Sequence, residues 1–114
     1  MLAARNRLKI KSGKRVAWEN KKEVYTPLFK MVYRLGGSKD PPKIGFIVSG
    51  KVGKATKRNR VRRLLSEAVR GRIEKFPNGF EGLVISSHNT GDAGYENICA
   101  CLDKILSKSR FDSD

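Results

Sequence analysis

The side chains best suited to chemistry lie in one basic segment, residues 51–72, which reads KVGKATKRNRVRRLLSEAVRGR. It holds nine lysines and arginines and a single acid, Glu67. Planar guanidinium groups donate paired hydrogen bonds to phosphate. The glycine loop 50–53 also leaves backbone N–H groups free to bind an anion at the start of the helix that follows. The segment therefore indicates recognition of a polyanion.

A solvated charged face without a ligand is the alternative for this segment. Such a helix normally mixes Glu with Lys to form i, i+4 pairs, whereas Glu67 stands alone. The whole chain carries a net charge of +14, and self-repulsion of that size is best offset by a polyanionic partner. Residues 1–22 and 51–72 hold nearly all of the excess, and residues 73–114 are net acidic. This uneven placement indicates a directed basic surface, whose partner could be a nucleic acid, an anionic membrane surface or an acidic protein.

Candidate catalytic groups are few. Asp92 and Glu96 are four residues apart and could share a metal ion, but acids at a helix start also complement the helix dipole, and we prefer that interpretation. His88 follows Ser86 and Ser87, yet no carboxylate is placed to complete a nucleophilic system. We therefore expect no catalytic residue in the protein.

Metal and membrane sites are not expected either. Cys99 and Cys101 are two residues apart and should point away from each other, as free thiols of a cytoplasmic protein. These cysteines and one histidine do not make a four-ligand zinc site. No apolar run is long enough to cross a bilayer, and no secretory signal is visible at the N-terminus.

The basic segment should form a helix over residues 55–72, capped by Thr56. Its apolar side chains recur at i, i+3, i+4, i+7 and i+8, which is one face of a helix. They are Val61, Leu64, Leu65, Ala68 and Val69. The opposite face then presents Asn59, Arg62, Arg63, Ser66 and Arg70.

The remaining elements predict a single α+β domain over residues 1–114. It would be a two-layer α/β sandwich with a small mixed sheet, one face of which is partly open. The second strand should pair with the first across a turn at 36–42. The expected elements are a loose arm (1–11), a weak helix (12–22), strands (27–35, 43–49 and 82–87), a second helix (94–108) and a frayed tail (109–114).

The segment closely resembles the signature of the bacterial ribonuclease P protein family, an Arg-Asn-Arg core after a Val-Gly-Lys-Ala loop. Here that core is Arg58-Asn59-Arg60. The resemblance also takes in KIGFIVS (43–49) and LVISS (83–87), and it covers about residues 7–106. It implies an element order α-β-β-(β)-α-β-α with a left-handed crossover.

The resemblance also implies a function. The protein would be the non-catalytic subunit of an endoribonuclease whose RNA binds Mg²⁺ and removes the 5′ leader of precursor tRNA. Its partners would be that catalytic RNA and the leader, with no stable protein partner required. The alternatives are a generic RNA-binding module, a DNA-binding protein and a self-sufficient nuclease. The last two are disfavoured, because a strand follows the basic helix and no acid cluster for two metals is visible.

The resemblance also implies roles for two sets of residues, assigned by their positions in the matching motifs. The surface that docks on the catalytic RNA should comprise Lys51, Lys54, Lys57, Arg58, Asn59, Arg60, Arg62, Arg63 and Arg70. The cleft that binds the leader should comprise Lys14, Trp18, Phe29, Tyr33, Phe46 and Val48. Lys14 stands where the family usually has an aromatic residue. Aromatic rings can stack on any unpaired base, but core packing is an equal alternative for Phe29 and Phe46.

Overall fold

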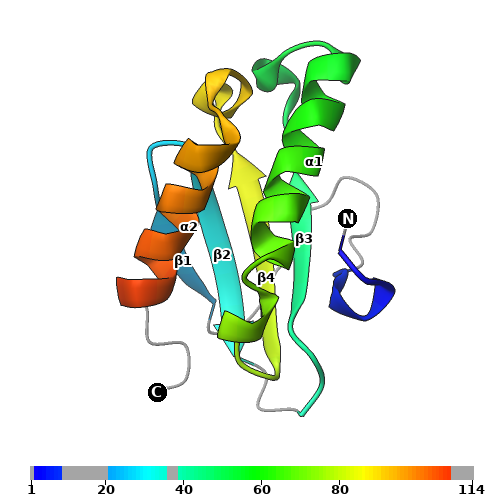
Figure 1. The fold of residues 1–114 in the computed structure, drawn as a ribbon, viewed down its shortest axis with the longest axis vertical. Coiled ribbons are helices and arrows are strands. Elements are labelled where there is room, and N and C mark those ends of the chain that lie inside the picture. The colour runs from blue at the N-terminus through cyan, green and yellow to red at the C-terminus, as the bar shows by residue number, and fades with distance from the viewer. Residues whose placement is uncertain (1, 9–20, 36–38, 109–114) are drawn as a thin grey trace.

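The computed structural model describes residues 2–8, 21–35 and 39–108, which form a four-stranded sheet with two α-helices on one face (Figure 1). The strands are β1 (Lys22–Tyr25), β2 (Phe29–Leu35), β3 (Lys43–Ile47) and β4 (Phe80–Ser86). The helices are α1 (Ala55–Arg70) and α2 (Tyr95–Lys108), and short 3-10 turns connect several elements. The α+β class and the layered arrangement are confirmed.

The strand order is β1-β2-β4-β3, with β3 parallel to β4 and the other pairs antiparallel. The predicted pairing of strand 43–49 with strand 27–35 is wrong, because β4 lies between them. The turn at 36–42 shows where the chain reverses, but it does not show which strand becomes the neighbour. β4 is buried along most of its length, as suits a central strand.

The first strand was not assigned from the sequence. Lys22 was expected to end a helix, but it begins β1, which pairs with β2 in a hairpin. Residues 12–20 of that predicted helix lie outside the described residues. Thr26 closes the hairpin, because its Oγ1 accepts hydrogen bonds from the backbone N–H groups of Leu28 (3.2 Å) and Phe29 (2.9 Å).

The connection from β3 through α1 to β4 is left-handed. In Figure 1 both strands run up the page behind α1, and β4 lies to the left of β3. Most crossovers between parallel strands have the opposite hand. The left-handed crossover that the resemblance implied is therefore confirmed.

The core lies between the sheet and the two helices. The apolar stripe of α1 supplies Val61, Leu65, Ala68 and Val69, all fully buried, and Leu64 packs at its edge. On the sheet, the ring of Phe80 stacks on Tyr33 with centroids 5.4 Å apart. The stripe expected from the helical spacing is confirmed. The helix begins at Ala55 after Lys54, so the prediction of Thr56 as its N-cap is wrong.

The segment of residues 2–8 packs along the edge of β3. Leu2 is only 3% exposed and belongs to the core. The side-chain amide of Asn6 donates to the carbonyl of Pro42 at 2.8 Å, and Arg7 forms a parallel bridge with Ile44. The predicted loose arm is therefore wrong for these residues.

Candidate nucleic-acid interface

The outward face of α1 is a strip of exposed polar and basic side chains, but the prediction that Ser66 belongs to it is wrong, because Ser66 is only 8% exposed. The apolar stripe of α1 faces the core, so the residues half a turn away point to solvent. Of the nine predicted docking residues, seven are exposed: Lys51, Lys54, Asn59, Arg60, Arg62, Arg63 and Arg70. The other two, Lys57 and Arg58, are half-buried. The structure thus brings the predicted set together on one helix and the loop before it.

Two residues of this set also contact the loop before α2. The Lys57 ammonium lies 3.1 Å from the Asp92 carboxylate, and the Arg60 guanidinium donates to the Gly91 carbonyl at 3.4 Å. The Nε of Arg58 is buried and has no hydrogen-bond partner among the described residues. These contacts of Lys57 and Arg60 hold the start of α1 in place, so the two side chains are less available to a ligand than their charge suggests.

Arg62 and Arg63 lie in the middle of the exposed face. One Nη of Arg62 donates to Asn59 Oδ1 at 3.0 Å, one turn earlier on the helix. That bond orients the guanidinium and uses only one of its five donors. Arg63 is exposed. Further along, Arg70 lies 3.6 Å from Glu67, a solvent-exposed pair that contributes little stability.

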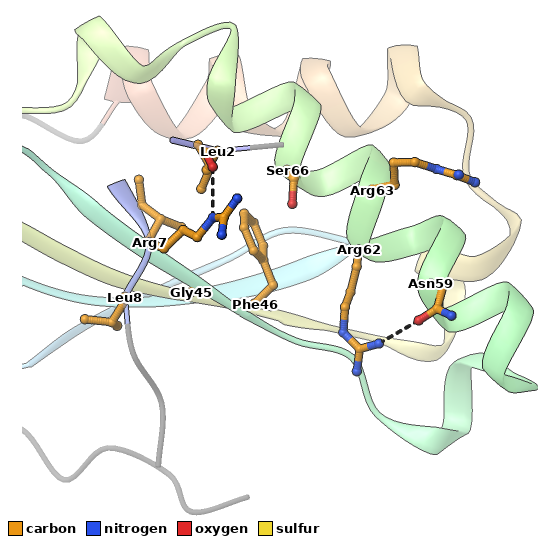
Figure 2. Close-up of a pocket in the computed structure, with 10 residues that line it drawn as sticks. Leu2, Arg7, Leu8, Gly45, Phe46, Asn59, Arg62, Arg63 and Ser66 are labelled. Carbon is orange, nitrogen blue, oxygen red and sulfur yellow. Dashed lines mark hydrogen bonds between the residues drawn. The ribbon is translucent and has the colours of Figure 1, made fainter. Parts of the chain in front are cut away.

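A groove runs beside this face, between residues 2–8, β3 and α1 (Figure 2). Its volume is about 460 Å³. It is lined by Leu2, Arg7, Leu8, Ile44, Gly45, Phe46, Asn59, Arg62, Arg63 and Ser66. Apolar side chains from the strand and the N-terminal segment thus meet guanidinium groups within one groove.

The residues predicted to form the leader cleft do not lie together in the structure. Phe29, Tyr33 and Val48 are 1%, 7% and 6% exposed and belong to the core. The prediction that these three residues line an open cleft is wrong, because they pack in the core between the sheet and the helices. Phe46 is half-buried and lines the groove, and Lys14 and Trp18 lie outside the described residues.

The opposite sheet face carries paired charges. Side chains alternate along a strand, so Lys30 and Arg34 point away from the helices. Lys30 pairs with Glu23 at 2.8 Å and Arg34 with Glu81 at 2.7 Å. The hydrogen bond from Lys30 lowers the pKa of Glu23. Tyr25, on the same face, is 69% exposed.

The sequence missed the N-terminal wall of the groove, formed by Leu2, Arg7 and Leu8. Local patterns could not reveal it, because the segment reaches the groove by pairing with β3, far along the chain. In addition, the described residues contain no group of three or more acids, cysteines or histidines placed to hold a metal ion. Within the described part of the chain no helix is long and apolar enough to span a membrane.

Comparison with known proteins gives one consistent family. A family model described as Ribonuclease P matches residues 2–110. The ribonuclease P protein component of Alkaliphilus oremlandii is 32% identical over 107 residues, covering 94% of this chain and 93% of that protein. The RNase P protein of Thermotoga maritima has the same fold, with a TM-score of 0.70 at 24% identity over 80% of this chain and 86% of that one. The Staphylococcus aureus protein matches at 0.70, with 19% identity over 100% of this chain and 99% of that one.

Proposed function

The chain belongs to the ribonuclease P protein family, and from this premise we propose how it serves as the protein subunit of that endoribonuclease. The basic face of α1 docks on the catalytic RNA, and another part of the surface contacts the 5′ leader of precursor tRNA. The RNA binds the Mg²⁺ ions and performs the hydrolysis. The protein itself supplies binding and positioning.

One observation supports the docking step above the others. A single helix buries Val61, Leu65, Ala68 and Val69 of its apolar stripe. It exposes Asn59, Arg62, Arg63 and Arg70 on its other side. Arginine contacts to phosphate supply most of the affinity of such interfaces, and each contact releases counterions. Binding to the catalytic RNA should therefore weaken steeply as salt is raised.

We propose that the leader binds to the face of the sheet opposite the two helices. The helix-facing side of β2 and β4 is filled by packed side chains, so the leader has no access there. The opposite face offers the exposed ring of Tyr25, with the Lys30 ammonium 5.5 Å from its centroid. An exposed aromatic ring can stack on an unpaired base of any kind. Trp18 stays a prediction for the same role.

The proposal is tested by cleavage of precursor tRNA at low Mg²⁺, using a bacterial ribonuclease P RNA with and without this protein. We expect the protein to stimulate cleavage at the mature 5′ end and to be inactive without the RNA. Tight binding to the RNA without stimulation would instead indicate a generic RNA-binding module. Cleavage by the protein alone would overturn the assignment of catalysis to the RNA.

A further inference from the structure

We propose that the groove between residues 2–8, β3 and α1 is a slot for one unpaired nucleotide of the bound RNA. The base would lie against Phe46 and its phosphate would meet Arg62. This inference rests on the proposed function, since it names what one part of the docking surface recognises. It adds a contact with a base to a docking surface whose other proposed contacts are with phosphates.

The shape of the groove supports a flat apolar group. Its volume of about 460 Å³ lies within the range of about 300–1,000 Å³ that is usual for small-molecule sites. Ile44 and Leu2 are buried beneath it, whereas Phe46 is half-buried and leaves part of its ring beside the open space. An aromatic ring held in this way can stack on any of the four bases, because every base has a flat face.

The charged side of the groove supports an anion. In the view of Figure 2, Phe46 lies between Arg7 on one side and Arg62 on the other. Among the described residues that line the groove, none carries a carboxylate. Burying an apolar ring next to cations suits a ligand that is itself both apolar and anionic, and a nucleotide is such a ligand.

Two hydrogen bonds hold the walls in position before any ligand binds. Arg62 donates to Asn59 Oδ1 at 3.0 Å, so the Asn59 oxygen is used and its NH₂ group remains a donor. On the other wall, Arg7 Nε donates to the Leu2 carbonyl at 2.9 Å, which fixes the turn of the N-terminal segment. Groups that are already ordered lose less entropy on binding.

The nucleotide should be unpaired. Bases inside an RNA duplex are stacked on both faces, and the deep major groove hides their edges from side chains. Only a base turned out of a loop, bulge or strand end could enter a groove of this kind. The slot should therefore require that the bound nucleotide be unpaired, whatever its base.

The test compares the affinity of the whole catalytic RNA for the full-length protein and three variants. Phe46→Leu removes the ring but keeps an apolar side chain, and should weaken binding about 5- to 10-fold with an unchanged salt slope. Arg62→Ala should weaken binding and lower the slope by about one. Phe76→Leu is the matched control, because Phe76 is a core ring that packs on Phe80 and does not line the groove. Thermal melts show which variants stay folded.

A photoreactive phenylalanine analogue at position 46 gives a second, independent readout. Crosslinks confined to an unpaired nucleotide would support the slot, and crosslinks confined to duplex would overturn it. If Arg62→Ala weakens binding and Phe46→Leu does not, docking stands and the slot is wrong. The slot is also wrong if Phe76→Leu costs as much affinity as Phe46→Leu. If the unmodified protein fails to bind the RNA, the proposed function itself fails.

Discussion

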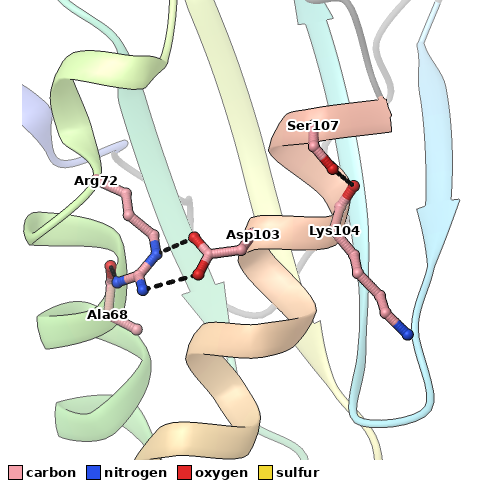
Figure 3. Close-up of polar contacts among 5 residues, drawn as sticks. All are labelled: Ala68, Arg72, Asp103, Lys104 and Ser107. Carbon is pink, nitrogen blue, oxygen red and sulfur yellow. Dashed lines mark hydrogen bonds and ion pairs between the residues drawn. The ribbon is translucent and has the colours of Figure 1, made fainter.

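Arg72 holds Asp103 through two hydrogen bonds, from Nε to Oδ1 at 2.6 Å and from Nη2 to Oδ2 at 3.1 Å (Figure 3). The remaining Nη1 donates to the Ala68 carbonyl at 3.2 Å, near the end of α1. One arginine of the basic segment thus joins α1 to α2. Its charge is used within the protein, which separates it from the exposed arginines of the docking face.

This pair predicts a dependence of stability on pH. The hydrogen bonds from Arg72 lower the pKa of Asp103 in the folded protein. A carboxylate with a lowered folded pKa stabilises the protein above its unfolded pKa of about 3.9, and that stabilisation is lost as the pH falls through the folded value. Asp103→Asn should therefore cost up to about 1 kcal/mol at pH 6, because the pair is partly exposed. Urea melts at pH 6 and pH 2.5 should show the difference shrinking in acid, whereas an equal difference at both would contradict the prediction.

Neighbouring leucines on α1 should respond differently to truncation. Leu65 is 0% exposed, so Leu65→Ala leaves a cavity and should cost roughly 2–5 kcal/mol of unfolding free energy. Leu64 is only partly buried at the edge of the core, and Leu64→Ala should cost clearly less. Thermal or urea melts of both variants show which substitution costs more unfolding free energy. Equal losses would mean that the helix is rotated from the packing described here.

Gly82 is a position where the strand cannot carry a side chain. A Cβ there would lie 2.7 Å from Cε1 of Phe80, whose fully buried ring is stacked on Tyr33. Gly82→Ala should therefore force the ring to move and cost about 1–3 kcal/mol. Gly50→Ala is the matched control, since a Cβ at Gly50 meets nothing within 4 Å. Equal melting temperatures for the two variants would show that the ring adapts freely.

Local patterns in the sequence predicted some features well and others poorly, for physical reasons. The spacing of Val61, Leu65 and Val69 fixes a helix face, because that geometry depends only on neighbouring turns. The alternation of side chains along β2 correctly predicted that Phe29 and Tyr33 lie on the same face of the sheet. It could not tell which side the helices would cover, since that depends on α2, which lies far along the chain. The same limit hid the insertion of β4 between β2 and β3.

Arg63 tests the docking face with little risk to folding, because it is exposed. Arg63→Ala should weaken binding to the catalytic RNA and reduce the slope of log affinity against log salt by about one. Lys104→Ala removes the same charge from α2, outside the docking face, and should leave both quantities nearly unchanged. Filter binding at several salt concentrations distinguishes the two. Equal effects would show that only net charge matters.

Tyr25 tests the leader face, because it exposes its ring on the side of the sheet away from both helices. In the reconstituted ribonucleoprotein, Tyr25→Leu should reduce affinity for precursor tRNA about 5-fold while affinity for mature tRNA stays the same, since only the precursor has a leader to stack. Tyr95→Leu is the matched control, because Tyr95 is also exposed but lies on α2. Equal losses for precursor and mature tRNA would place Tyr25 at the docking interface instead. An effect of Tyr95→Leu alone would move the leader to the helical side.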